Sequence, residues 1–233
     1  MNKSIVSHAF LLAVMALASG CDKSAQSDMT KSTVATPGAE APPIIESKIA
    51  KKSYDGPFGL AAGISVAELK SMGFEESEVT PGVLRGTPPK PFSEPGEYAI
   101  VATPEAGLCR IRATFDVATV NGAGDQIKAK VDQLAETLQL KYGKHSTKID
   151  YISRDVYRRN AEFWMMALRE DSVVYAYDWS SGKTEQAMPN RLANIEVVAN
   201  AIDSSSGFAA INYNFDNREA CMTEAKKLKA ANL

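Results

Sequence analysis

Histidine is nearly absent from this chain of 233 residues, which contains only His8 and His145. We expect His8 to leave with an N-terminal signal segment, so a Ser-His-Asp or Cys-His catalytic arrangement would have to use His145 alone. His145 follows a predicted helix end at Gly143, a position that favours a solvent-exposed loop residue. Zinc sites of the usual kind need several histidine or cysteine ligands. The sequence therefore predicts no metal site, no cofactor and no catalytic residues.

Long apolar runs and an excess of charge of one sign are also missing. The longest apolar run, Ala9 to Ala18, is about half of the ~20 residues that a transmembrane helix needs. Lysine and arginine together number 26, and aspartate and glutamate 28, which gives a formal net charge of -2. This balance argues against a nucleic-acid partner. The hydrophobic share of 45% excludes disorder of the whole chain.

Residues 1–20 are predicted to be a signal peptide, because Lys3 precedes a short apolar run. The segment that follows, Leu17-Ala18-Ser19-Gly20-Cys21, resembles the lipobox of bacterial lipoproteins. This resemblance implies that Cys21 is lipidated and becomes the first residue of the mature protein, held in a membrane by several acyl chains. Asp22 resembles the signal for retention in the inner membrane. We therefore expect a lipid-anchored protein of the bacterial cell envelope that faces the periplasm; the alternative is an ordinary signal peptide with an incidental cysteine.

The chain has only three cysteines, and lipidation of Cys21 would leave two, Cys109 and Cys221. The periplasm permits disulfides, so we predict that these two form one. The bridge would close a loop of about 113 residues, for which the chain-entropy model gives at most roughly 4.8 kcal/mol of stabilisation. Two buried free thiols are the alternative.

The chain divides into a leader, a tether and one domain. Residues 21–53 are rich in Ser, Thr, Ala, Pro and Lys and show no lasting apolar period, so we expect a flexible tether after the lipidated cysteine. Residues 54–233 are predicted to form a single α+β domain, with a mainly antiparallel sheet packed by two or three helices. The expected strands are 57–60, 82–85, 98–102, 108–117, 172–179, 194–202 and 208–215. The expected helices are 66–72 (capped by Ser65), 125–142, 161–169 and a last one capped by Asn217.

Alternation along the strand at 108–117 places Cys109, Ile111 and Phe115 on one face. Cys221 lies on the apolar side of the last predicted helix. We therefore expect both cysteines to point at one core, and the last helix to pack across that face of the sheet.

A locally basic stretch at 141–159 is a candidate surface for an anionic partner or for lipid headgroups. Its cations are Lys141, Lys144, Lys148, Arg154, Arg158 and Arg159. The alternative is a solvated helix end and loop, because cations are favourable near a helix C-terminus.

Two other motifs have ordinary structural interpretations. The segment Asn121-Gly122-Ala123-Gly124 precedes a helix, but it lacks the third glycine of a dinucleotide fingerprint and the Gly-Lys-Ser/Thr of a P-loop. We interpret it as a turn and helix cap. Tyr175, Tyr177 and Trp179 alternate along a strand, which favours a core or interface face over a carbohydrate platform.

Several short segments resemble those of an uncharacterised family of bacterial envelope lipoproteins. They are the lipobox, Pro57–Leu60, Ile64-Ser65-x-x-Glu68-Leu69, Leu138-x-x-Lys141-Tyr142-Gly143 and Asn212-Tyr213-x-Phe215-x-Asn217-x-x-x-Cys221. The segment Gly63 to Gly73 is also similar to the start of the small lipoproteins of the outer-membrane β-barrel assembly machine. The resemblance implies an envelope protein partner. We expect a lipid-anchored, non-enzymatic binding or accessory domain; the alternatives are an envelope hydrolase that uses carboxylates and an inhibitor or immunity lipoprotein.

Overall fold

The computed structural model describes residues 52–94, 96–117 and 119–231. The predicted signal peptide, Cys21, Asp22 and nearly all of the predicted tether lie outside these residues. The described residues belong to one compact unit. Among them, no helix combines the length and the apolar character needed to cross a membrane.

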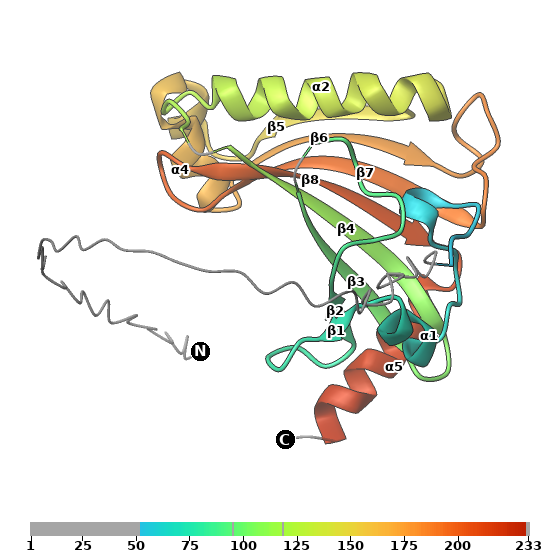
Figure 1. The fold of residues 1–233 in the computed structure, drawn as a ribbon. Coiled ribbons are helices and arrows are strands. Elements are labelled where there is room, and N and C mark those ends of the chain that lie inside the picture. The colour runs from blue at the N-terminus through green and yellow to red at the C-terminus, as the bar shows by residue number, and fades with distance from the viewer. Residues whose placement is uncertain (1–51, 95, 118, 232–233) are drawn as a thin grey trace, which may run out of the picture. The chain divides into compact units, whose positions relative to one another are not determined.

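In the described part of the chain, eight strands form one sheet in the order β1-β2-β3-β4-β8-β7-β6-β5 (Figure 1). Every neighbouring pair is antiparallel. The strands are β1 (Glu75–Glu76), β2 (Val83–Arg85), β3 (Glu97–Thr103), β4 (Gly107–Val117), β5 (Thr147–Ile152), β6 (Val173–Ser180), β7 (Leu192–Ala201) and β8 (Gly207–Phe215). The α+β class and the antiparallel sheet predicted from the sequence are confirmed.

The described residues also form five α-helices, of which α2, α4 and α5 make the main helix contacts with the sheet. The helices are α1 (Val66–Ser71), α2 (Asp125–Tyr142), α3 (Asp155–Arg158), α4 (Trp164–Arg169) and α5 (Arg218–Ala231), with 3-10 helices at Pro57–Gly59 and Ala161–Phe163. The predicted cap of α1 is confirmed, because the Glu68 backbone N–H donates to the Ser65 hydroxyl at 3.2 Å.

The predicted strand at 57–60 is wrong. Pro57–Gly59 forms a 3-10 helix, closed by a hydrogen bond of 3.0 Å from the Leu60 N–H to the Pro57 carbonyl. Proline fixes φ at a value suited to the first turn of a helix and has no N–H to donate to a sheet.

The sheet has a covered face and an open face. The N-terminal segment, α1, α2 and α4 lie over the covered face, whereas α5 lies on the opposite side at the ends of β3 and β4 (Figure 1). The covered face carries buried apolar residues: Ile100, Ile111, Phe115, Ile195, Val197, Ile211 and Tyr213. The open face carries the intervening residues, and between β4 and β6 these are mostly polar: Arg110, Arg112, Asp178, Asn194, Glu196, Asn212 and Asn214.

The structure corrects the predicted direction of Cys109. Val101 of β3 pairs with Arg110 of β4, and the next pair is Ala102 with Leu108. A β-bulge therefore leaves Cys109 without a partner in β3. A bulge breaks the alternation of side chains, because two residues of one strand oppose one residue of the other. Cys109 turns toward α5 instead of into the core of the covered face, and α5 does not pack across that face.

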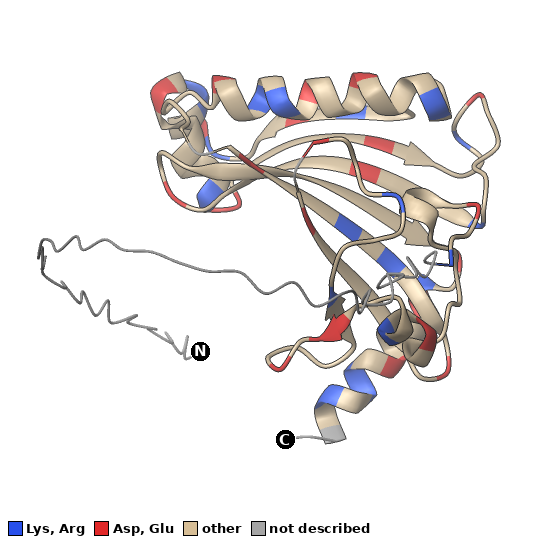
Figure 2. Cartoon of the chain, in the orientation of Figure 1, with Lys and Arg blue, Asp and Glu red and all other residues tan. Residues whose placement is uncertain are grey.

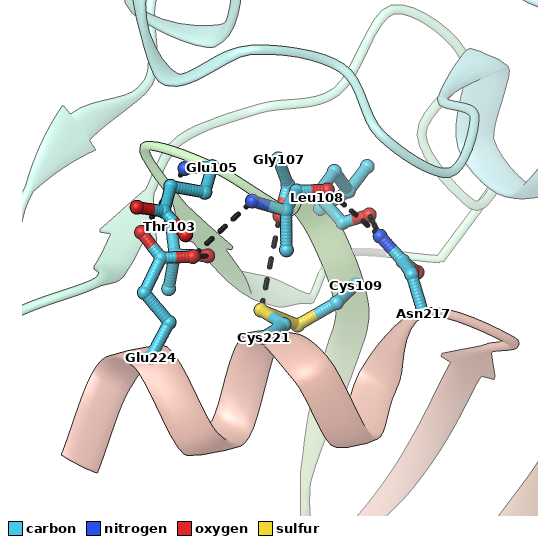
Figure 3. Close-up of a disulfide and its surroundings, with 9 residues drawn as sticks. Thr103, Glu105, Gly107, Leu108, Cys109, Asn217, Cys221 and Glu224 are labelled. Atoms are coloured by element: carbon cyan, nitrogen blue, oxygen red, sulfur yellow. Dashed lines mark hydrogen bonds between the residues drawn. A yellow bond between two sulfur atoms is a disulfide. The ribbon is translucent and has the colours of Figure 1, made fainter. Parts of the chain in front are cut away.

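Helix α5 is fixed to the hairpin of β3 and β4 by a disulfide and by hydrogen bonds (Figure 3). The predicted Cys109–Cys221 disulfide is present, with the two Cα atoms 6.2 Å apart. Glu224, one turn further along α5, accepts hydrogen bonds from the backbone N–H groups of Glu105 at 3.0 Å and Ala106 at 3.2 Å. The hairpin thereby holds α5 at two successive turns.

Asn217 occupies the N-cap position of α5, as predicted, because the helix begins at Arg218 and the Cys221 backbone N–H donates to the Asn217 carbonyl at 3.1 Å. Its side chain, however, does not cap the helix. Its side-chain amide donates to the carbonyls of Ala106 at 2.9 Å and Leu108 at 3.1 Å, and its Oδ1 has no partner among the described residues. Asn217 is thus a third link between the hairpin and α5.

Acid is expected to loosen α5 through Glu224. Burial raises the pKa of this carboxyl, but its hydrogen bonds to Thr103, Glu105 and Ala106 outweigh burial and hold the pKa below its ordinary value of 4.5. Because the folded-state pKa is the lower one, the stabilisation is present above the ordinary value and is lost as the pH falls through the folded-state value. The protection factors of the α5 amides, which correct for the slower intrinsic exchange in acid, should therefore fall as the pH drops below the ordinary value of 4.5.

The matched variants are Glu224→Gln and Glu219→Gln, both on α5. Glu224→Gln should show faster exchange of α5 already at pH 7, whereas Glu219→Gln should show a smaller change, because it loses only the favourable position of a carboxylate in the first turn of the helix. Equal exchange in the two variants would contradict this role of Glu224.

Strand β5 has no counterpart among the predicted strands. Five of its six side chains are exposed. A strand exposed on both faces lacks the alternation of apolar and polar residues by which strands are identified in a sequence.

Candidate functional site

A row of hydrogen-bonded polar side chains crosses the open face. Arg112 of β4 lies opposite Asn212 of β8, which lies opposite Glu196 of β7. Arg110 donates from Nη2 to Asn212 Oδ1 at 2.8 Å, and Asn212 donates from Nδ2 to Glu196 Oε2 at 2.9 Å. Asn212 is only 2% exposed, so this row is the floor of the open face.

A second row runs parallel to the first. Asn214 of β8 donates to Asn194 Oδ1 at 2.7 Å, and Asn194 donates to Asp178 Oδ2 at 2.9 Å. Ser180 donates to the other oxygen of Asp178. We call the two rows together the polar ladder.

The positive charge of the polar ladder lies at its β4 end and the negative charge on β6 and β7 (Figure 2). No described carboxylate forms an ion pair with Arg110 or Arg112. Arg110 Nε is buried and has no hydrogen-bond partner among the described residues. A buried donor without a partner is destabilising, so this end of the ladder is suited to an added acceptor.

The pKa shifts of the two arginines also support an added acceptor at this end of the ladder. Burial lowers the pKa of the Arg110 guanidinium, and the nearby charges of Arg112 and Arg218 lower it further, while Glu196 raises it. Burial also lowers the pKa of Arg112. Glu196 is the carboxylate whose charge acts on both arginines, and it already accepts a hydrogen bond from Asn212. The positive charge at the β4 end of the ladder favours an anionic group there.

The structure does not bring together the six cations of the predicted basic stretch. Lys141 and Lys144 precede β5, whereas Arg154, Arg158 and Arg159 follow it, and a strand of this length spans about 17 Å. Three of the six are in ion pairs: Lys148 with Asp132 at 3.6 Å, Arg154 with Glu170 at 2.9 Å and Arg158 with Asp155 at 2.9 Å.

The aromatic residues of β6 are part of the core. Tyr175 and Tyr177 each donate to the Asp132 carboxylate of α2 at 2.7 Å, and the Trp179 indole donates to the Gly143 carbonyl at 2.8 Å. Burial, followed by the hydrogen bond to Asp132, raises the pKa of Tyr175 to about 12. This face of β6 therefore holds α2 on the sheet.

His145 is half-buried, not solvent-exposed as predicted. Its ring packs edge-on against Tyr177 and Trp179, with centroids 4.8 and 6.0 Å away. Burial lowers the pKa of His145, and the charges of Lys144 and Lys148 lower it further. The imidazole is a packing element at the margin of the core.

The segment Asn121 to Gly124 is a turn and helix cap, as interpreted from the sequence. The Asp125 backbone N–H donates to Asn121 Oδ1 at 3.0 Å at the start of α2. Gly124 has φ of 72° and lies against Trp164. The Asn121 side chain therefore already uses the first N–H of α2.

The open face also holds a pair of carboxylates, the feature required by the hydrolase alternative. Glu196 and Asp178 lie directly opposite each other on β7 and β6. Each accepts a hydrogen bond from an asparagine of the ladder. In the described ranges, no group of three or more His, Cys, Asp or Glu side chains could hold a metal ion.

The polar ladder is not predicted from the sequence. Its signal is polar residues at every second position of three strands: Arg110 and Arg112, Asn194 and Glu196, and Asn212 and Asn214. Such alternation is what a strand with one solvent-facing side shows, so it does not by itself mark a site. Comparisons of the chain with protein-family models, curated proteins and solved structures give no match.

Proposed function

We propose that this chain is a lipid-anchored, non-enzymatic binding domain of the bacterial cell envelope. It faces the periplasm and holds an acidic segment of an envelope protein on the open face of its sheet. The lipobox-like segment that ends at Cys21 supports the anchor, and the Cys109–Cys221 disulfide supports an oxidising compartment. The observation that carries the binding role is the pair Arg110 and Arg112, whose charges no described carboxylate neutralises in an ion pair.

The arginine pair fits a carboxylate better than it fits an apolar ligand. The planar guanidinium presents several N–H groups in a fixed geometry that matches carboxylate oxygens. Residues 110 and 112 of a strand point to the same side, about 7 Å apart along the chain, so one acidic segment can reach both.

The anchor is tested by Cys21→Ser. This variant should lose label from a palmitate analogue and either leave the membrane fraction or remain unprocessed, because the thioether has no other attachment point. The double variant Cys109→Ala/Cys221→Ala is the control and should keep its label. Equal labelling of the wild type and Cys21→Ser would overturn the anchor.

Binding on the open face is tested with Arg110→Gln/Arg112→Gln and a defined peptide of ten glutamates. We expect roughly tenfold or greater loss of affinity, because hydrogen bonds to charged groups contribute about 1.5–3 kcal/mol each. The affinity of the wild type should also fall as salt is added.

The matched control is Lys141→Gln/Lys144→Gln, which removes two cations of the predicted basic stretch and leaves the open face intact. This control should bind the peptide like the wild type. The reverse result would move the site to the basic stretch. Binding of the wild type to vesicles of anionic phospholipid, with no binding of the peptide, would replace the protein partner by a membrane surface.

A further inference from the structure

Strand β5 has a free edge. It is the last strand of the sheet, and among the described residues only β6 pairs with it. The free edge of a strand presents N–H and C=O groups that can pair with a strand of another chain. The sequence of β5, Thr-Lys-Ile-Asp-Tyr-Ile, determines which strand fits there.

The hydrogen bonds of β5 show which of its backbone groups point toward β6. Ser153, next to the strand, donates its N–H to the Ser172 carbonyl at 2.8 Å. Backbone groups alternate in direction along an antiparallel strand, so those of Tyr151 and Ile149 also point toward β6.

The backbone groups of Lys148, Asp150 and Ile152 therefore point outward. Arg158 donates from Nε to the Ile152 carbonyl at 2.8 Å, which agrees with this direction and closes that end of the edge. The N–H and C=O groups of Lys148 and Asp150 remain as the part of the edge that a new strand can use.

We propose that a second copy of this chain pairs with β5 in antiparallel orientation, with the two strands centred on Ile149. In a symmetric antiparallel pair, the central residue of β5 lies opposite the same residue of the second copy. The outward backbone groups allow this central residue to be 148, 149 or 150. Centring on 148 places Lys148 opposite itself, and centring on 150 places Asp150 opposite itself. Like charges directly opposite each other are destabilising, and opposite charges are stabilising. Centring on Ile149 places Lys148 of each copy opposite Asp150 of the other, which gives two pairs of opposite charge.

The side chains of the open face agree with this register. Ile149 lies opposite itself, in a pair without direct hydrogen bonds whose Cα atoms are about 4.5 Å apart. Ile149, Tyr151 and Val174 are 36%, 54% and 40% exposed, and Tyr151 pairs with Val174 in the sheet. Pairing of two copies would cover part of this apolar surface and extend the open face across both sheets.

Cysteine cross-linking of the purified full chain tests the pairing. In Ile149→Cys, the two introduced thiols lie within the 4.4–6.8 Å range of Cα separations in disulfides, so mild oxidation with copper phenanthroline should convert most of the protein to a covalent dimer. Val79→Cys is the control, because this residue is 90% exposed and lies between β1 and β2, at the opposite edge of the sheet from β5. It should cross-link only at the background level of random collisions.

The register is tested by adding Asp150→Lys to Ile149→Cys. Lys148 would then face a lysine twice, and the yield of dimer should fall about tenfold. Asp150 is chosen because Lys148 also contacts Asp132, Tyr175 and Tyr177 and its loss could disturb the fold. Background yield from Ile149→Cys would overturn the pairing, and an unchanged yield after Asp150→Lys would overturn the register.

Discussion

Replacing both Cys109 and Cys221 with alanine is expected to lower the free energy of unfolding by about 3–5 kcal/mol. The disulfide joins residues 112 positions apart, so it removes much of the conformational freedom of the unfolded chain. Both sulfur-bearing residues are fully buried, and the variant also loses packing between β4 and α5. For a domain of this size the melting temperature should fall by roughly 6–20 °C.

The local effect should be larger at α5 than elsewhere. The helix is the last described element of the chain, and the links that remain are the hydrogen bonds of Asn217 and Glu224. Hydrogen exchange of α5 should therefore accelerate first, while β7 and β8 stay protected. Reduction of the wild type should reproduce the variant. Unchanged protection of α5 in both samples would contradict the disulfide as its main attachment.

Gly124→Ala is the second substitution with a large expected effect. Gly124 has φ of +72°, and a Cβ atom there would lie 2.1 Å from the Trp164 ring. The left-handed conformation costs an alanine about 1–2 kcal/mol, and the displacement of a well-packed ring adds about 1–3 kcal/mol. Trp164 is only 3% exposed, so the ring has little room to move. We expect a loss of about 2–5 kcal/mol in urea denaturation.

Gly182→Ala is the matched control for this substitution. Gly182 has φ of +77°, but nothing lies within 4 Å of the position of an added Cβ. It therefore reports the backbone cost alone, about 1–2 kcal/mol. If both variants lose the same amount, the contact between Gly124 and Trp164 contributes nothing to the effect.

The regular elements with strong patterns could be predicted from the sequence. The apolar stripe from Ile127 to Tyr142 and the glycine after it predict α2, and Ser65 with Glu68 predicts the start of α1. The late strands alternate clearly enough to be placed within one or two residues. These predictions succeed because periodicity and capping are local properties of the chain.

Features that depend on which strands become neighbours could not be predicted in this way. The polar ladder needs β4, β8, β7 and β6 side by side, and residues 110 and 212 are far apart in the chain. The predicted basic stretch fails for the converse reason, because β5 runs through it and separates its two ends. Strand β5 itself lacks a pattern, since both of its faces are exposed.

For the two cysteines, the pairing could be predicted from the sequence, but the side of the sheet on which they lie could not. The number of cysteines and the expected periplasmic location were enough to predict a disulfide between Cys109 and Cys221, because few other pairings exist. Alternation, however, places Cys109 on the covered face, and the structure turns it to the other side, toward α5. The reason is the β-bulge, which arises from the shift in register between β3 and β4. The sequence alone thus determined which residues are linked, whereas strand pairing decided on which side of the sheet the link and the helix lie.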